Sequence, residues 1–128
     1  MTHPMKLTAQ AICESYVAAF NARDLDALRA LFTADGVVVH PVEGEVPFEP
    51  FFRPFFDGGR SATLELISPF QAVNGTDAAV YMRGTWHYPH GAITLPCADI
   101  FECDAASGKI KRLTAIFDGG RLRAHAAL

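Results

Sequence analysis

The sequence has 128 residues, of which 50% are hydrophobic and 20% charged, as is typical of one globular domain spanning residues 1–128. A net charge of −3 without a lysine- or arginine-rich run argues against a nucleic-acid partner. No apolar run reaches membrane-spanning length and residues 1–4 lack a signal-peptide pattern, so we expect a cytoplasmic protein that does not bind membranes.

The first third of the chain predicts two helices and a strand. Between Met5 and Asn21 the apolar residues recur at helical spacing. Asp24 is suited to cap a second helix, which must end by Asp35-Gly36. Three valines after that turn are typical of a buried strand, and Pro41 ends it.

The segment Phe48–Phe56 carries two conflicting signals. Its phenylalanines recur at helical spacing, but Pro50 and Pro54 oppose a regular helix. We therefore expect a kinked or broken aromatic segment that Gly58-Gly59 closes. The conformation of residues 43–59 does not follow from the sequence.

The rest of the chain predicts antiparallel strands joined by turns. The expected strands are Ser61–Val73, Ala78–Tyr88, Ile93–Cys103 and Ile110–Phe117. Asn74-Gly75 is a strong hairpin signal between the first two. Helices followed by a long antiparallel meander define an α+β domain.

Three polar residues stand in apolar surroundings. His40 ends the valine strand, and it is either a hydrogen-bonded core histidine or a base that faces a cavity. Asp99 lies in a mostly apolar strand, where a carboxyl group either finds polar partners or has its pKa raised until it stays protonated. Tyr16 fits the buried face of the first helix, where its hydroxyl needs a partner. Each residue alone has an ordinary structural explanation.

The sequence around these residues resembles a known family. The chain resembles the ketosteroid isomerase and SnoaL-like group of the NTF2-like superfamily. The segments that resemble this group are Tyr16–Phe20, Asp24–Leu28, Phe32–Gly36, Val38–Pro41, Asp99–Glu102, Ser107–Ile110 and Leu113–Phe117. The resemblance implies an NTF2-like (cystatin-like) cone, a curved antiparallel sheet wrapped around N-terminal helices with a deep apolar pocket. It also implies a homodimer that needs no cofactor.

The resemblance further implies a role for each polar residue. Tyr16 and Asp99 match the two groups that stabilise the substrate oxyanion in the isomerases. His40 stands where the isomerases have an aspartate as general base, so it is the predicted base and the point at which this chain departs from them.

An apolar wall for the substrate is predicted from further side chains, each of which also fits plain core packing. These residues are Phe20, Phe52, Phe55, Phe56, Met82, Trp86, Phe101 and Phe117.

Neither a disulfide nor a metal site is expected. The cysteines, Cys13, Cys97 and Cys103, are odd in number and lack Cys-x-x-Cys spacing, which favours free thiols. None has a basic setting that would favour a nucleophile. His87 and His90 have a spacing seen in metal ligands, but they flank a proline turn and lack a carboxylate partner.

Two functions fit these observations. The first is a cofactor-independent isomerase, cyclase or dehydratase that acts by proton transfer on a small apolar carbonyl compound. The alternative is a non-catalytic module that binds a small hydrophobic ligand or dimerises. The substrate and the protonation state of Asp99 are left open by the sequence.

Overall fold

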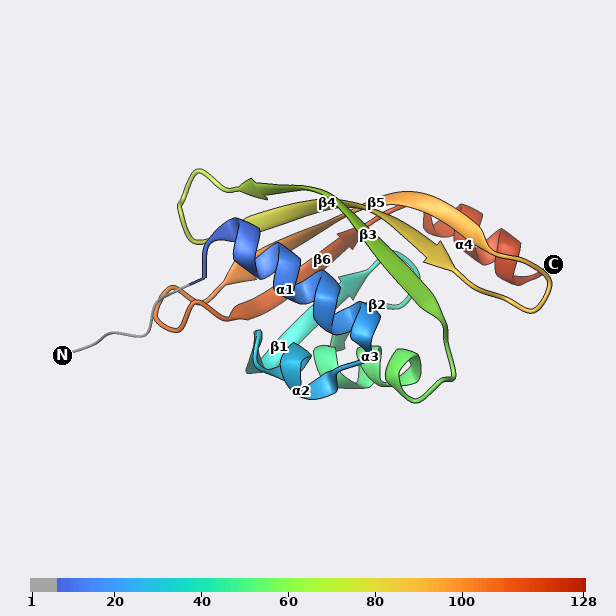
Figure 1. Cartoon of the computed structure of the whole chain (residues 1–128), viewed down its shortest axis with the longest axis horizontal. Coiled ribbons are helices and arrows are strands. Elements are labelled where there is room, and N and C mark those ends of the chain that lie inside the picture. The colour runs from blue at the N-terminus through green and yellow to red at the C-terminus, as the bar shows by residue number, and fades with distance from the viewer. Residues whose placement is uncertain (1–6) are drawn as a thin grey trace.

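A computed structural model of the chain describes residues 7–128, and within them a curved six-stranded sheet carries helices on one face and at its ends (Figure 1). The elements are α1 (Ala9–Ala22), α2 (Leu25–Arg29), β1 (Phe32–His40), β2 (Gly44–Pro47), α3 (Phe48–Phe56), β3 (Ala62–Gln71), β4 (Ala78–Trp86), β5 (Ile93–Cys103), β6 (Ile110–Ile116) and α4 (Gly119–Ala126). This is the predicted α+β architecture. The predicted start of the first helix at Met5 lies outside the described residues.

The strand order is β2-β1-β6-β5-β4-β3. Neighbouring strands are antiparallel except β1 and β6, which are parallel, whereas the sequence predicted only antiparallel strands. The parallel pair follows from the chain path. After β2 the chain passes through α3 to the far edge of the sheet, and β3 to β6 then return strand by strand until β6 meets β1.

The second helix is shorter than predicted. It ends at Arg29, and β1 already begins at Phe32, which pairs with Ile110 of β6. The pairing register then shifts before Val37, so Asp35-Gly36 lies in an irregular part of the strand and not in a turn before it. Asp24 caps the helix as predicted, because its side chain accepts from the Ala27 amide at 3.0 Å.

The aromatic segment was expected to be kinked or broken, and it forms one continuous helix, α3, so the broken alternative is wrong. Pro50 lies in the first turn, where a backbone N–H has no helical partner to lose. Pro54 lies inside the helix, and burial of Phe48, Phe52 and Phe55 offsets its missing hydrogen bond.

Helix α4 and strand β2 were not predicted. In α4 only Leu122 is buried, so the helix lacks the apolar repeat by which helices are recognised in a sequence. Asp118 begins it by accepting from the Arg121 amide at 3.0 Å. α4 lies at one end of the long strands, well apart from α1 in the view of Figure 1.

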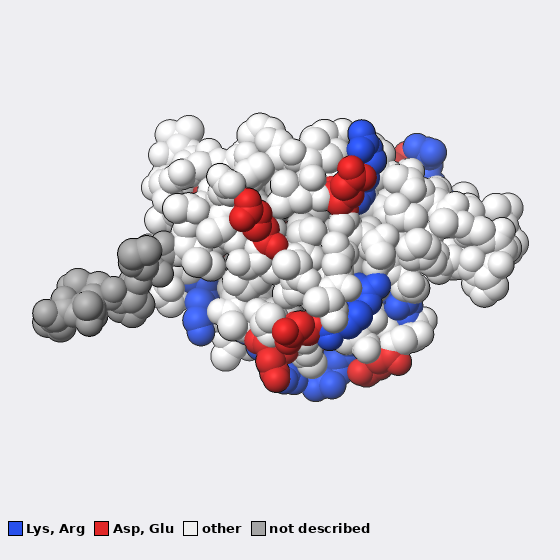
Figure 2. All heavy atoms as spheres, viewed as in Figure 1, with Lys and Arg blue, Asp and Glu red and all other residues white. Residues whose placement is uncertain are grey.

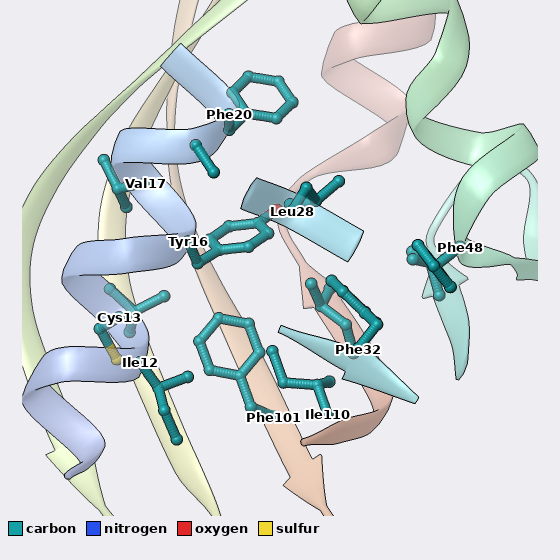
Figure 3. Close-up of a cluster of buried hydrophobic side chains, with 14 of the residues drawn as sticks. Ile12, Cys13, Tyr16, Val17, Phe20, Leu28, Phe32, Phe48, Phe101 and Ile110 are labelled. Carbon is teal, nitrogen blue, oxygen red and sulfur yellow. The ribbon is translucent and has the colours of Figure 1, made fainter. Parts of the chain in front are cut away.

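The core lies between α1 and the concave face of the sheet. Tyr16 and Phe20 project from α1 to the same side, and the ring of Tyr16 lies above that of Phe101 on β5 (Figure 3), with 5.2 Å between the ring centroids. Phe32 and Phe48 stack at 4.6 Å between centroids and join β1 to α3. A continuous aromatic core therefore connects the helices to the middle of the sheet.

Charged side chains are few and mixed in sign on the face of the molecule in Figure 2. The ion pairs of α2 and α3 are likewise mixed in sign, because Arg29 pairs with Asp26 and Glu49, and Arg53 also pairs with Glu49. This face therefore presents no continuous basic surface of the kind that binds nucleic acid. Among the described residues, no helix is both long and apolar enough to cross a bilayer.

Candidate functional site

A cavity of about 50 Å³ lies between α1, α3 and the concave face of the sheet, and we call it the inner cavity. Nine of the eleven residues predicted for the site line it, namely Tyr16, Phe20, His40, Phe52, Phe55, Met82, Trp86, Asp99 and Phe117. Phe51, Val38, Ala62, Leu64, Cys97, Leu113 and Ala115 also line it and were not predicted. Most of its surface is therefore apolar, with three polar groups exposed to it.

The other two predicted residues lie behind the wall. Phe101 packs under the ring of Tyr16, and Phe56 stacks on Phe52 at 6.4 Å between centroids. Both support residues that line the inner cavity without lining it themselves. The spacing of apolar residues along a strand or helix predicts which side chains are buried. It does not predict which buried side chains line a cavity and which support those that do.

Tyr16 and Asp99 form the inner end of the cavity. Tyr16 comes from α1 and Asp99 from β5, and their exposed fractions are 4% and 5%. The Tyr16 hydroxyl and the Asp99 carboxyl share a hydrogen bond. Burial raises the pKa of Asp99 from 3.8 to about 7, while the hydrogen bond from Tyr16 opposes this rise. Burial, followed by the nearby Asp99 charge, raises the pKa of Tyr16 well above its usual value.

His40 lies at the outer end of the cavity, where β1 stops. Its ring lies 5.1 Å from that of Phe51 on α3 and 5.1 Å from that of Phe117, measured between centroids. Its Nδ1 atom accepts from the backbone amides of Val42 at 3.1 Å and Glu43 at 3.3 Å. Burial lowers the pKa of His40, with Glu43 raising it and Arg60 lowering it further.

The sheet register brings His40 and Asp99 into one row. Val39 lies opposite Thr114 in the parallel pair, so the next residue, His40, lies beside Ala115. Ala115 in turn pairs with Asp99 on β5. His40 and Asp99 thus flank the small side chain of Ala115, with their backbones two strand spacings apart, about 10 Å. A small molecule bound over Ala115 would lie between the two polar groups.

A larger cleft of about 550 Å³ adjoins the inner cavity, and we call it the outer cleft. His40, Phe55 and Trp86 line both spaces and form the boundary between them. The other walls of the outer cleft come from the turn after β1, the loops after α3 and β4, and α4, through Val42, Glu43, Gly58–Ser61, His87–Pro89, Leu122, Arg123 and Ala126. The sequence did not predict this cleft, because its walls are turns and a helix without an apolar repeat.

Gly84 makes room for Trp86 at that boundary. Both residues lie on the concave face of β4. A Cβ atom on Gly84 would lie 2.8 Å from the Trp86 ring, closer than side chains can approach. The missing side chain thus fixes where the indole lies.

The cysteines and the paired histidines were expected to form neither a disulfide nor a metal site. The three cysteines are free and buried, and burial raises the pKa of Cys97 in the cavity wall to about 12. His87 Nε2 lies 3.3 Å from Thr63 Oγ1, whereas His90 Nε2 lies 2.8 Å from the carbonyl oxygen of His125. The two rings therefore face different partners. In the described part of the chain, no three His, Cys, Asp or Glu side chains are grouped to hold a metal ion.

A curved sheet with helices over its concave face and a cavity between them defines the NTF2-like, cystatin-like class of proteins. Within this class, the family model of the SnoaL-like domain matches residues 13–113. The chain belongs to the SnoaL-like family, as the resemblance predicted. No curated protein matches the chain in sequence.

Three solved structures illustrate the similarity. A protein of Catenulispora acidiphila with a ketosteroid isomerase-like fold, in complex with trimethylamine, has 17% identity and a TM-score of 0.77 over 94% of this chain and 95% of its own. A putative polyketide cyclase of Pseudomonas putida has 26% identity and a TM-score of 0.66 over 88% and 92%. The epoxide hydrolase/cyclase-like enzyme SalBIII, of pyran ring formation in salinomycin, has 18% identity and a TM-score of 0.73 over 86% and 90%.

Proposed function

We propose that this protein is a cofactor-independent isomerase, cyclase or dehydratase that moves a proton on a small apolar carbonyl compound. The observation that carries the proposal is the inner cavity, whose apolar wall is interrupted by Tyr16, Asp99 and His40. Proton transfer next to a carbonyl group needs a group that takes the proton and donors that stabilise the oxyanion. Tyr16, Asp99 and His40 are the groups of the cavity wall that can take or donate a proton.

The size of the two spaces limits the substrate. A cavity of about 50 Å³ holds only about four water molecules, so it accepts the reacting end of a molecule and not a polycyclic body. The outer cleft of about 550 Å³ has room for the remainder. The likeness to the putative polyketide cyclase of Pseudomonas putida supports a substrate with several carbonyl groups.

The test uses cyclohex-3-enone, whose conversion to the conjugated enone is followed by ultraviolet absorption. We expect turnover above the buffer rate that Asp99→Asn reduces by about 10²-fold or more. The matched control is Asp57→Asn, which changes an exposed carboxyl group outside the cavity. Equal rates for the wild type and Asp99→Asn would contradict the proposal.

A non-catalytic binding module is the second candidate, and the small volume of the inner cavity favours it. Phe20, Phe52 and Phe55 occupy space that a ligand would otherwise take. This candidate predicts that cyclohexanone binds, with changes in the methyl and aromatic NMR signals of the cavity, while no carbonyl substrate turns over. Turnover that depends on Asp99 would exclude it.

We also propose that two copies of the chain pair through the convex face of the sheet, as the family resemblance implied. Four exposed apolar side chains lie there on adjacent strands, namely Phe70, Tyr81, Ile100 and Ile116. Sedimentation should give a dimer for the wild type and a monomer for Ile116→Glu, and a monomeric wild type would contradict the proposal. The cytoplasmic location stays a prediction.

A further inference from the structure

We propose that His40 is held as a neutral donor, with its proton on Nε2 facing the inner cavity, and that Asp99 is the group that takes the proton from the substrate. This inference rests on the proposed function and assigns the roles differently from the family resemblance, which made His40 the base. It follows from the hydrogen bonds of the turn after β1 and from the row that His40 forms with Asp99.

The hydrogen bonds on Nδ1 determine where the proton lies. A neutral imidazole carries one N–H and one nitrogen with a free lone pair. Nδ1 faces two backbone N–H groups, those of Val42 and Glu43, and backbone N–H groups can only donate. Nδ1 must therefore accept, so the ring proton lies on Nε2. A base acting through Nε2 would need its proton on Nδ1, where it would meet these two N–H groups.

The same contacts disfavour the doubly protonated ring, because a proton on Nδ1 would again face two N–H groups. The surroundings act in the same direction. Phe51 and Phe117 cover the imidazole from α3 and from the end of β6, and burial lowers the pKa of His40. The charged neighbours, Glu43 and Arg60, largely neutralise each other in an ion pair of 2.6 Å. His40 is thus a neutral donor near neutral pH.

The turn that carries the two amides is itself held in place. Arg60, in the loop after α3, pairs with Glu43. Gly119, at the start of α4, lies so close that a Cβ atom there would be 3.1 Å from the Pro41 side chain and 3.2 Å from the Val42 side chain. Two separate parts of the chain therefore support the turn, as expected for a device that fixes a ring orientation.

Because His40 acts as a donor, Asp99 is the group in the row of His40, Ala115 and Asp99 that can accept the proton. It is the only carboxyl group that lines the inner cavity, within the described residues. Tyr16 shares its hydroxyl proton with Asp99 and so orients the carboxyl group. A base that titrates near neutral pH is suited to take a proton and return it.

The step balances without an oxidant or a cofactor. The Asp99 carboxylate takes the proton from the carbon next to the carbonyl group, and the C–H electron pair becomes the C=C bond of an enolate. The enolate oxygen accepts a hydrogen bond from His40 Nε2–H, and His40 keeps its proton. Asp99 then returns the proton to a carbon further along the conjugated system, which gives the isomer.

The first test reads the tautomer directly and needs no substrate. In two-dimensional ¹⁵N–¹H spectra of protein with ¹⁵N-labelled histidine, His40 should show a protonated Nε2 and an unprotonated Nδ1 near neutral pH. Loss of these signals in His40→Gln assigns them to His40. A protonated Nδ1, with or without a proton on Nε2, would overturn the proposal.

The second test separates a donor from a base, with cyclohex-3-enone as the probe. Gln in place of His40 keeps an N–H near the position of Nε2, whereas Asp supplies a base without a donor. We expect His40→Gln to lose about 10-fold in kcat/KM and His40→Asp about 10²-fold or more. The reverse order would make His40 the base. A wild type that does not turn over the probe would count against the proposed function, and the spectra would still decide the tautomer.

Discussion

The two ends of the inner cavity hold their polar groups in different ways. At the inner end, Tyr16 and Asp99 come from the middle of α1 and β5, where both are buried and share a hydrogen bond. At the outer end, His40 is the last residue of β1, and a turn fixes its ring through backbone amides. The inner end thus sets the proton affinity through burial, and the outer end sets the direction of a hydrogen bond.

This difference implies that amino-acid substitutions have different effects at the two ends of the cavity. A side chain held by a helix and a strand depends on the whole core, so a substitution there affects folding and chemistry together. A ring held by a turn depends on a few local contacts, so its orientation can change while the fold persists. Substitutions at each end should therefore have distinct signatures.

The largest effect is expected at the inner end, from Asp99→Asn. The amide has the shape of the carboxyl group but cannot take a proton, so turnover of cyclohex-3-enone should fall by about 10²- to 10⁴-fold. Circular dichroism should show an unchanged fold, because the buried amide can still accept from Tyr16. Full activity would mean that the inner end is structural only.

The same variant should change how stability depends on pH. Burial raises the pKa of Asp99 from 3.8 to about 7, so between these values the folded protein holds a proton that the unfolded chain releases. Folded-state stability should therefore fall as pH rises through this window, by about 4 kcal/mol for a shift of about three units. Asp99→Asn has no carboxyl group to titrate, so its stability lacks this dependence on pH.

Urea unfolding should accordingly show that Asp99→Asn gains stability relative to the wild type as pH rises from about 4 to about 7. Below about pH 4 the carboxyl group is protonated in both states, so no gain is expected there. Asp57→Asn, at an exposed position, serves as the control. Parallel pH profiles for the wild type and Asp99→Asn would show that Asp99 keeps its charge when folded.

At the boundary with the outer cleft, Gly84→Ala should act by moving Trp86. The added methyl group would lie 2.8 Å from the indole, so the ring must shift and stability should fall by about 1–3 kcal/mol. Gly59→Ala is the matched control, because the nearest atom to its Cβ is 3.6 Å away. Tryptophan fluorescence should therefore change in Gly84→Ala and stay the same in Gly59→Ala. Unchanged fluorescence in Gly84→Ala, with equal stability of both variants, would show that the space at Gly84 is not needed.

The smallest effect on stability is expected from Arg60→Ala at the outer end. An exposed ion pair such as that with Glu43 contributes less than about 1 kcal/mol. The variant should nevertheless loosen the turn that holds His40, which ¹⁵N–¹H spectra can detect as a second tautomer. An unchanged His40 spectrum would show that Gly119 supports the turn without Arg60.

The inner end could be predicted from the sequence because period-2 and helical spacing determine which side chains face the core. Asp99 interrupts an apolar strand face and Tyr16 lies on an apolar helix face, so both signals are local. The outer end depends on main-chain N–H groups of Val42 and Glu43, and any residue except proline supplies such a group. The sequence therefore contains no sign of the tautomer of His40.

Helix formation at α3 also could not be predicted. Pro54 is a local signal against a helix, and burial of Phe48, Phe52 and Phe55 against the rest of the core outweighs it. That burial depends on residues distant in the sequence, so no local pattern reveals it. The same holds for α4, whose position against Pro41 and Val42 is a tertiary contact.

The parallel pairing of β1 with β6 has a consequence for the order in which the site can form. His40 lies in the first strand and its row partners, Ala115 and Asp99, in the last two. During synthesis, nearly the whole chain must leave the ribosome before β6 can pair with β1 and bring these residues together. A truncated chain that ends before β6 retains Tyr16, His40 and Asp99 but lacks the strand that joins β1 to β5. Activity should therefore appear only with the complete sheet, and never in proportion to the length synthesised.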